Sequence, residues 1–596
     1  MVFLKNNIRI FVVTLIVVTF IWSRSHMVVS HFSDYDDLFV PYLYLVIGNY
    51  DIPYFRDQFI NYGGIIATMP MQWMYDLFNQ FPSFFDAFKR IILPIIMSKS
   101  STSAPLQFFI TSLTLDLNTS YTHSLLTSRI PSSIFSIMTL YILHLFSKEF
   151  NKEDRVYLFL VGASILTFSW MFLIYSSQSE VYAAPVFAVM SLFLIFIKNY
   201  KHTLSIIRSL WVGVLLILLC FTSYQVLFFL PGFFIALFYS FRFSIKRFMS
   251  SWLFAGLITI LGVYIIYLLF FSQLNSTRSS IGISWNSGPN SEYLFDAFNS
   301  CDRLESFRCL YIFFKNNTFD VFRSILSFSD IDTLVSKVYT VIIFLLSIVG
   351  LIYLFLKKSE HYKEILVFIL VNIITWTVLV YFQLISFSPT RHSLVLLVPI
   401  IILTSFGILG VRSIVPEKYY NFFPYFFYAC ILYLLTIYLF NFEGQKQKRI
   451  DPFQKIDFIS IVESYNVTKI ITYDETLNVF LYPEINAKFD YEFFGDHYLS
   501  PNVLTQKNST DKDDAIMIVS YKDEISVHDA SNDLLPMFKD YPLDSYQLIY
   551  SYKFQSDTQS SFGDLAKSGS NNLFINIYSP HSLEFCEEHE MLCYKF

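Results

Sequence analysis

The chain has 596 residues, of which 54% are hydrophobic and only 15% are charged. A water-soluble protein of this size could not bury so large an apolar fraction, so the composition excludes an ordinary soluble globular protein. Several apolar runs approach the length of about 20 residues that a helix needs to cross a hydrocarbon core of about 30 Å. We therefore expect a polytopic α-helical membrane protein.

Eleven membrane spans are predicted. They lie near residues 8–23, 130–147, 156–175, 182–198, 206–222, 224–241, 251–271, 338–356, 364–385, 393–411 and 420–441. The first span could also be a cleaved signal peptide, but residues 23–26 (SRSH) offer no small-x-small cleavage site, so we favour an uncleaved anchor. Because this apolar stretch is short, Arg9 and Arg24 are expected to snorkel to the two membrane interfaces.

Basic residues gather on one side of the predicted membrane. With the N-terminus inside, the inner segments hold sixteen basic residues, whereas the short outer loops hold one, Arg391. The inner residues are Lys5, Arg9, Lys148, Lys152, Arg155, Lys198, Lys201, Arg208, Arg242, Lys246, Arg247, Lys357, Lys358, Lys363, Arg412 and Lys418. This asymmetry predicts that the N-terminus lies inside and the C-terminus outside, and it favours splitting the apolar run 209–240 near Ser223.

The predicted topology leaves three large outer segments, residues 24–129, 272–337 and 442–596. We therefore expect a transmembrane domain over 1–441 and an outer soluble domain over 442–596. The tail contains 25 acidic and 13 basic residues. An acidic tail on the outer side fits the charge asymmetry and argues against nucleic acid as a partner.

Two outer segments contain predicted elements of their own. The first has aromatic and apolar patches at 81–85 and 91–96, which we expect to form amphipathic helices in the membrane interface, and 105–117 is similar. The tail has β-rich runs at 469–473, 515–519 and 573–577, separated by helix-like and polar stretches. This pattern predicts a small α/β domain. No Gly-rich phosphate loop follows these strands, which argues against nucleotide binding.

Four of the six cysteines form close pairs in predicted outer segments, Cys301 with Cys309 and Cys586 with Cys593. Each pair is either a disulfide, if the outer space is oxidising, or two free thiols brought close by chance. Cys220 and Cys430 fall in spans and are most simply packing residues. No C-x-x-C pair or Cys/His cluster indicates a metal site, and a requirement for a divalent cation stays open.

The densest acidic cluster follows the first span, within residues 33–39, and contains Asp34, Asp36 and Asp37. Three carboxylates so close together repel one another, so one could have a raised pKa, as a general base needs. The alternative is a solvated loop or a helix N-cap, where Asp is favoured. The predicted spans contain almost no ionisable residues, which argues against a proton- or ion-coupled transporter.

Several stretches, in chain order, resemble the motifs of one family of membrane enzymes. Asp36-Asp37-Leu38-Phe39 resembles an Asp-Asp/Glu motif after the first span, and 52–59 (IPYFRDQF) resembles a Pro-Tyr-Arg-Asp segment. Residues 104–109 (APLQFF) and 128–132 (SRIPS) look like a Pro-Pro-Leu helix and an Arg-Leu-Pro-Ser span opening, and 389–394 (PTRHSL) resembles an Arg-Tyr/His motif. Together they resemble the GT-C membrane glycosyltransferases, such as dolichyl-phosphate-mannose protein mannosyltransferases and bacterial lipid A aminoarabinose transferases.

One further stretch resembles a family motif but differs from it at one position. Residues 178–183 (QSEVYA) lie where many members have a segment ending in Arg-x-Tyr-Ala, and Glu180 stands in place of the Arg. Any contact that the family makes through that Arg is therefore not carried over to this chain.

The resemblance implies an inverting transfer of a sugar from a polyprenyl-phosphate donor to a glycan, lipid or protein acceptor on the outer face of the membrane. Asp36 would be the base that deprotonates the acceptor, with Asp37 or Asp34 as substitutes. Arg391, fork-shaped for phosphate, would bind the leaving lipid phosphate. His392 would either assist it or cap the next helix.

The other candidate residues have alternative roles. Arg56 would bind the phosphate or pair with Asp57. Arg129 and Tyr182 would be interface anchors rather than ligands. The location implied is a multi-pass protein of a bacterial inner membrane or an ER-type membrane.

Two other function classes remain open. One is a polysaccharide polymerase or ligase of another membrane fold, which would more typically carry Arg-rich late outer loops and no Asp pair after the first span. The other is a transporter or flippase, in which repeated halves and buried charges are expected. The donor sugar and the acceptor cannot be read from the sequence.

Overall fold

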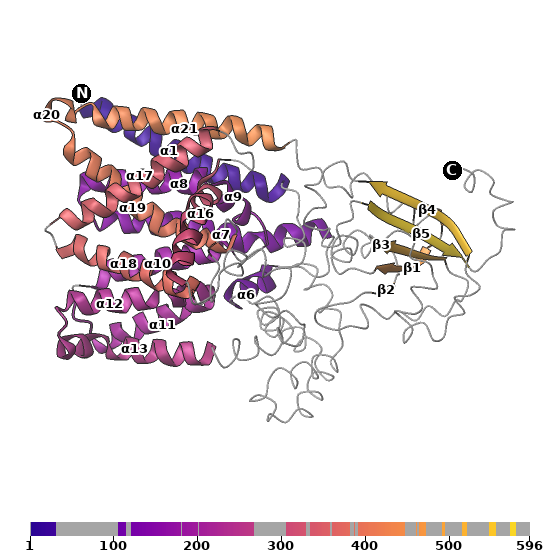
Figure 1. The fold of residues 1–596 in the computed structure, drawn as a ribbon, viewed down its shortest axis with the longest axis horizontal. Helices are drawn as coiled ribbons and strands as arrows, with labels where there is room; N and C mark the ends of the chain where they lie inside the picture. The colour runs from indigo at the N-terminus through magenta and orange to yellow at the C-terminus, as the bar shows by residue number, and fades with distance from the viewer. Residues whose placement is uncertain are drawn as a thin grey trace. The chain divides into compact units, whose positions relative to one another are not determined.

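A computed structural model gives the fold as two compact units, a helical unit and a β-sheet unit in the tail (Figure 1). The structure describes residues 2–30, 105–114, 121–179, 182–200, 202–266, 306–328, 334–357, 360–381 and 391–446, together with a few single positions and the strands of the tail.

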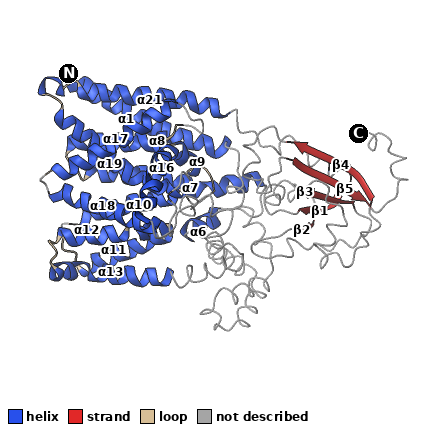
Figure 2. Ribbon diagram, viewed as in Figure 1, coloured by secondary structure: helices blue, strands red, loops and turns tan. Residues whose placement is uncertain are grey.

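The described part of the first unit is helical, with short turns between helices (Figure 2). Its elements are α1 (Val2–Ser30), α6 (Pro105–Thr114), α7 (Tyr121–Lys148), α8 (Lys152–Phe168), α9 (Trp170–Tyr175), α10 (Ala183–Asn199), α11 (Ile206–Thr222), η2 (Tyr224–Phe228), α12 (Leu230–Ser240), α13 (Ile245–Ile266), α16 (Ser306–Leu326), α17 (Leu334–Leu356), α18 (Glu360–Tyr381), η5 (Arg391–Leu396), α19 (Leu397–Ile414), α20 (Glu417–Tyr420) and α21 (Phe423–Lys446).

Seven of the described helical segments are long and apolar enough to cross a membrane. They are Asn7–Val29, Leu126–Lys148, Ile245–Ile266, Leu334–Leu356, Tyr362–Val380, Ser393–Ile414 and Phe423–Phe442. Three further apolar helices, α10, α11 and α12, are shorter. The chain is therefore a multi-pass membrane protein, whereas the count of eleven spans and the orientation stay predictions.

Two predicted spans are divided in the structure. Residues 156–175 form α8 and α9 with a break at Ser169, whose Oγ accepts a hydrogen bond from the Phe172 N–H at 3.1 Å and so caps α9. Residues 224–241 form η2 and α12, separated from α11 at Ser223 as predicted. Because Phe168 and Trp170 flank the break, the hydropathy pattern is continuous there and does not indicate it.

The segment predicted as the second outer loop contains a helix, α16, that the sequence analysis did not predict. Val321, Ile325 and Leu326, near the C-terminal end of α16, are fully buried, and so is Phe328 just beyond it. The helix packs against α9, α17 and η5. Because its other face is polar, α16 does not read as a span in the sequence.

Helices extend into both ends of the segment 24–129, which was predicted as the first outer segment. Helix α1 continues to Ser30, α7 begins at Tyr121, and α6 lies within the predicted stretch 105–117. The predicted interfacial patches at 81–85 and 91–96 lie outside the described residues.

Small residues let the backbones of α17 and α19 approach closely. A Cβ atom added at Gly350 would lie 1.9 Å from the Leu403 carbonyl oxygen, and one added at Gly407 would lie 2.0 Å from the Leu346 carbonyl oxygen. Ser347 and Thr404 share a hydrogen bond of 2.9 Å between their hydroxyls. Glycine and hydroxyl residues thus hold these two helices together, as is common where lipid removes the hydrophobic drive for helix association.

The second unit holds a five-stranded mixed sheet in the order β2-β1-β3-β5-β4. Its strands are β1 (Val467–Thr472), β2 (Glu492–Phe494), β3 (Ala515–Ser520), β4 (Gln547–Gln555) and β5 (Asn572–Ser579). The β1–β2 and β1–β3 pairs are parallel, and the β3–β5 and β5–β4 pairs are antiparallel.

Three strands match the predicted β-rich runs, whereas β2 and β4 were not predicted. Ile575 and Ile577, two positions apart on β5, are both fully buried and therefore share one face of the sheet. Ile575 pairs with Val519 of β3, and Ile577 pairs with Met517. The helices expected for an α/β domain lie outside the described residues.

Candidate functional site

A buried polar cluster lies where α6, α7 and the α9–α10 turn meet. We call it the Gln107 cluster and define it as Gln107, Ser132, Ser133 and the turn Ser176–Ser179. Gln107 is fully buried, and its Nε2 donates to Ser132 Oγ at 2.8 Å and to the Ser179 carbonyl oxygen at 3.3 Å. Ser133 Oγ donates to the Ser176 carbonyl oxygen at 3.1 Å. The cluster therefore ties three separate helical elements together.

The serines of the turn have a local reason to be there. Helix α9 ends at Tyr175, and the last carbonyls of a helix have no partner within the helix. Ser176 Oγ and Ser177 Oγ donate to the Leu173 carbonyl oxygen at 3.0 and 2.8 Å. Because Ser176 and Ser177 are buried, these hydroxyls supply partners that solvent cannot supply.

The Gln107 cluster brings together three of the stretches that carry the family resemblance. Gln107 belongs to 104–109, Ser132 to 128–132, and Ser179 to 178–183. A fourth stretch, which contains Arg391, forms the start of η5, and η5 packs against α9, α10 and α16. Stretches that lie far apart in the sequence therefore meet on neighbouring elements of one unit.

Tyr182 and Arg129 were predicted to be interface anchors, and the structure shows the surroundings of both side chains. Tyr182 is half-buried, and its ring lies edge-on to Tyr175 with 5.3 Å between ring centroids. Arg129 is 1% exposed, and its Nη1 donates to the Val28 carbonyl oxygen at 2.8 Å. The anchor prediction is wrong for Arg129, because α1 extends far enough beyond residue 23 to meet its side chain.

Arg24 was expected to snorkel to an interface, and this prediction is also wrong. Its side chain is 2% exposed, and its guanidinium lies 3.6 Å from the centre of the Phe20 ring. Its Nη2 donates to the Leu166 carbonyl oxygen at 2.7 Å. The side chain points into the helical unit because α8 offers it a carbonyl acceptor there.

Most of the acidic and basic candidates lie outside the described residues. These are Asp34, Asp36, Asp37, Arg56, Asp57 and Glu180, and for Arg391 and His392 only the backbone of η5 is described. Neither cysteine pair has described side chains. The roles assigned to these residues therefore stay predictions.

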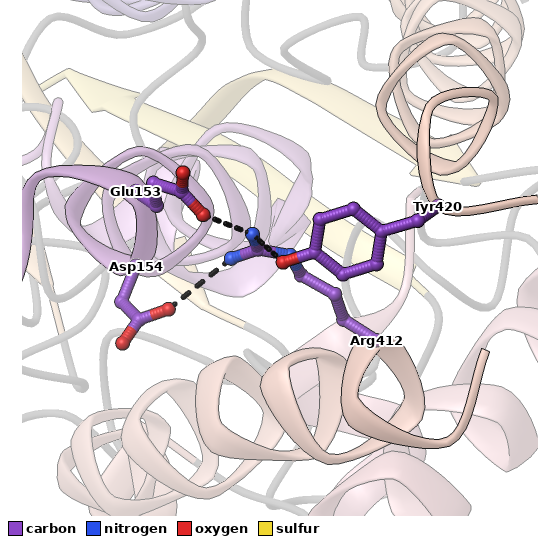
Figure 3. A network of polar contacts seen from close by, with 4 residues as sticks. All are labelled: Glu153, Asp154, Arg412 and Tyr420. Atoms are coloured by element: carbon purple, nitrogen blue, oxygen red, sulfur yellow. Dashed lines mark hydrogen bonds and ion pairs between the residues drawn. The ribbon is translucent and has the colours of Figure 1, made fainter. Parts of the chain in front are cut away.

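A second polar cluster lies where α8 begins and α19 ends, at the same end of the helical unit as the N-terminus and α20 (Figures 1 and 3). Arg412 contacts Glu153 and the Tyr420 hydroxyl, and its Nη1 lies 3.2 Å from Asp154 Oδ1. Burial raises the pKa of the Asp154 carboxyl, and the Arg412 guanidinium opposes this shift. The donors of Arg412 are engaged within the protein, so we interpret this cluster as structural.

Metal-ligating residues do not gather within the described ranges. Over these residues, no group of three or more His, Cys, Asp and Glu side chains is placed to hold a metal ion. The acidic segment 33–39 lies outside them.

The chain can be compared with known proteins. No protein-family model matches the sequence, and no curated protein matches it. The chain is similar in structure to ArnT from Cupriavidus metallidurans, solved as a crystal structure bound to undecaprenyl phosphate. The TM-score is 0.42 and the identity 8%, over 80% of this chain and 88% of that chain.

Proposed function

We propose that the protein is a membrane glycosyltransferase that moves a sugar from a polyprenyl-phosphate donor to an acceptor on the outer face of the membrane. The observation that supports this most is the Gln107 cluster. One amide, Gln107 Nε2, bonds to two other stretches of the motif set, at Ser132 and Ser179. A chance similarity of short motifs gives no reason for them to lie side by side.

The reaction assigned to the site is a displacement at the anomeric carbon with inversion. Asp36 accepts the proton of the acceptor hydroxyl while the acceptor oxygen bonds to the sugar, and the bond from the sugar to the phosphate oxygen breaks. A hydroxyl is a poor nucleophile, so a carboxylate within hydrogen-bond reach gives general-base assistance. Asp37 or Asp34 takes this role if Asp36 is not the base.

The leaving group is a lipid phosphate, whose charge calls for a cation. Arg391 begins η5, which packs against the helices on both sides of the α9–α10 turn. A guanidinium can bind two phosphate oxygens at once, so Arg391 is proposed to bind the phosphate, with His392 beside it. Arg56, Asp57, Glu180 and Tyr182 are proposed to line the donor and acceptor sites.

The test is sugar transfer in vitro from a panel of radiolabelled polyprenyl-phosphate sugars, with membranes that contain matched amounts of each variant. We expect Asp36→Asn or Asp37→Asn to lower the rate by about 100-fold or more, because general-base catalysis typically contributes 10²–10⁴. We expect Arg391→Ala to raise KM for the donor about tenfold or more, as loss of a charge-assisted contact implies.

The matched control is Asp320→Asn. Asp320 is an acid on α16 that pairs at 3.7 Å with Arg323 on the protein surface, so its substitution should leave transfer unchanged. Activity that survives both Asp substitutions would overturn the assigned base. Absence of transfer with every donor, together with substrate uptake into vesicles, would favour a transporter, and chain elongation of a glycan would favour a polymerase.

A further inference from the structure

The loops that join α10 to α11 and α12 to α13 are rich in positive charge. Residues 182–266, which contain both loops and the four helices, hold six Lys and Arg residues and no Asp or Glu. Ser240 Oγ donates to the Tyr200 carbonyl oxygen at 2.9 Å, so the two loops lie side by side. They lie at the end of the helical unit where α8 begins, because Lys198 at the end of α10 pairs with Glu149 at 3.8 Å.

The acidic residues beside the start of α8 do not neutralise this charge. Glu149 pairs with Lys198, and Glu153 and Asp154 contact Arg412. Three other basic side chains of the two loops are exposed and form no ion pair in the described part of the chain, namely Arg208, Lys246 and Arg247. We call these three residues the basic surface.

Helices α11 and α13 run parallel from this end. Ser209 Oγ of α11 accepts a hydrogen bond from the Ala255 N–H at 3.0 Å, and a Cβ atom added at Gly262 would lie 2.3 Å from Ile217 Cγ1. Ser209 is the fourth residue of α11, whereas Ala255 is the eleventh residue of α13. At a rise of about 1.5 Å per residue, α13 therefore begins about 10 Å further out at this end than α11.

Both helices have a basic first turn. Arg208 lies in the first turn of α11, Lys246 and Arg247 lie in the first turn of α13, and neither turn contains an acidic residue. A cation is unfavourable at a helix N-terminus, because the unpaired N–H groups there carry partial positive charge. An anion beside the basic surface would therefore interact favourably with the side chains and with both helix starts.

Large apolar side chains surround these charges. Ile206 and Ile207 of α11 are more than half exposed, and so are Phe243 and Ile245 at the start of α13. Figure 1 shows α13 at the edge of the helical unit, where it packs against α11 and α12. Its other face is also exposed and apolar, with Leu257, Ile260 and Leu261. Basic residues mixed with exposed apolar ones are typical of a surface at the boundary between lipid tails and head groups.

The turn before α13 holds Phe243 in this boundary position. Arg242 and Phe243 have φ angles of 52° and 56°, which L side chains rarely adopt. Their N–H groups donate to the Tyr239 and Phe238 carbonyl oxygens at 2.8 and 3.1 Å, and the Phe243 ring lies edge-on to Phe238 with centroids 5.3 Å apart. Such a backbone costs free energy. Burial of the exposed ring among lipid tails offsets part of that cost.

We propose that the basic surface binds the phosphate head groups of anionic phospholipids in the leaflet that faces this end of the protein. Lipid is favoured over a free anion or an acidic protein segment because the apolar side chains beside the charges need contact with hydrocarbon, which only a lipid supplies together with a phosphate. The basic surface lies at the other end of α10 from the Gln107 cluster. The inference therefore does not rest on the proposed sugar transfer.

The test uses the purified full-length protein in a neutral detergent, titrated with short-chain phosphatidylglycerol or with phosphatidylcholine of the same chain length. A ligand that binds the folded protein raises its unfolding temperature, so phosphatidylglycerol should raise it more than phosphatidylcholine does. Lys246→Gln combined with Arg247→Gln should weaken the apparent affinity for phosphatidylglycerol about 25-fold, because each basic residue near anionic lipid contributes about fivefold. Arg208→Gln should have a smaller effect, since Arg208 lies deeper along the helices.

The matched control is Lys152→Gln combined with Lys418→Gln. Both lysines are exposed, and each has an acidic neighbour in the sequence, Glu153 or Glu417. The control removes the same charge as the double variant and should leave the lipid preference unchanged. Size-exclusion profiles without lipid show whether each variant is folded. If the double variant is not folded, Lys246→Gln and Arg247→Gln are tested singly, and native mass spectrometry counts the phosphatidylglycerol that each retains.

Each result bears on the proposal. A preference for phosphatidylglycerol that is lost in the double variant and kept in the control supports it. Equal effects of the two lipids, or a preference that the double variant keeps, would overturn it. An equal rise with inorganic phosphate would assign the basic surface to a free anion, and an equal rise with polyglutamate would assign it to an acidic protein segment. Either of these outcomes would reject lipid as the partner.

Discussion

At the residue scale, single buried polar side chains determine how several elements contact one another. In an apolar surrounding each unsatisfied donor or acceptor is costly, so a buried amide, hydroxyl or guanidinium is placed where a partner exists. Gln107 and Arg24 both follow this rule, and both bond to carbonyls outside their own helices. The sequence analysis passed over Gln107 because it stands inside a short apolar stretch, although a lone Gln between aromatics and Leu is a usable indication of a buried partner.

Replacement of Gln107 by Leu should destabilise the helical unit and lower sugar transfer. The change leaves the volume similar but removes the bonds to Ser132 and Ser179, so we expect a loss of about 1–3 kcal/mol in the free energy of unfolding. Thermal unfolding in detergent measures it. Leu113→Ala is the control, because Leu113 lies on the same helix α6 and is 74% exposed. Equal unfolding temperatures for the two variants would contradict the role assigned to Gln107.

Breaks and close contacts define the structure at the scale of elements. The α8–α9 break depends on the arrival of the α16 end, and the α17–α19 contact depends on glycines that face backbone. Neither is visible in hydropathy, because Ser169 and Gly350 lie in continuous apolar runs. The tertiary partner therefore determines where these helices stop and how closely they pack.

Gly350→Ala should strongly reduce the amount of folded protein. The new Cβ would lie 1.9 Å from the Leu403 carbonyl oxygen, so the two helices must move apart. Overpacking of this kind typically costs about 1–3 kcal/mol and occasionally more. The measurement is the monodisperse fraction and the unfolding temperature in detergent.

Gly256→Ala is the matched control for this substitution. A Cβ added at Gly256 meets nothing within 4 Å, and Gly256 also lies inside a helix, α13. Replacing a helical Gly with Ala there should be neutral or stabilise the helix by up to about 1 kcal/mol. If both variants behaved like wild type, the close approach of α17 and α19 would be refuted.

The chain divides into a helical unit, which ends at Lys446, and a second unit, which contains the sheet of the tail. The positive residues of the short loops predict that the sheet unit lies outside. Protease added to right-side-out vesicles should therefore remove the tail and leave the helical unit in the membrane. Mass analysis of the membrane-bound fragment measures this. A tail that is cut only in inside-out vesicles would reverse the predicted orientation.

The helices and strands whose sequences have a regular apolar pattern were predicted correctly. Apolar runs of helical length gave the membrane class and a helix in each predicted span, and β-rich runs gave β1, β3 and β5. The less regular elements were missed. Strand β2 is very short, β4 mixes polar and apolar residues, and α16 has one polar face, so none has the composition on which the predictions rested.

The sequence by itself determined that this protein lies in a membrane, because its apolar fraction permits no other solvent. It also supplied the candidate acids and cations, since residue type and order are enough to recognise a motif. Only the tertiary structure showed that Gln107 joins three of these stretches, that Arg24 and Arg129 point inward, and that α16 meets the α8–α9 break. Such contacts depend on which buried carbonyls lack a partner, and that is known only once distant helices are packed together.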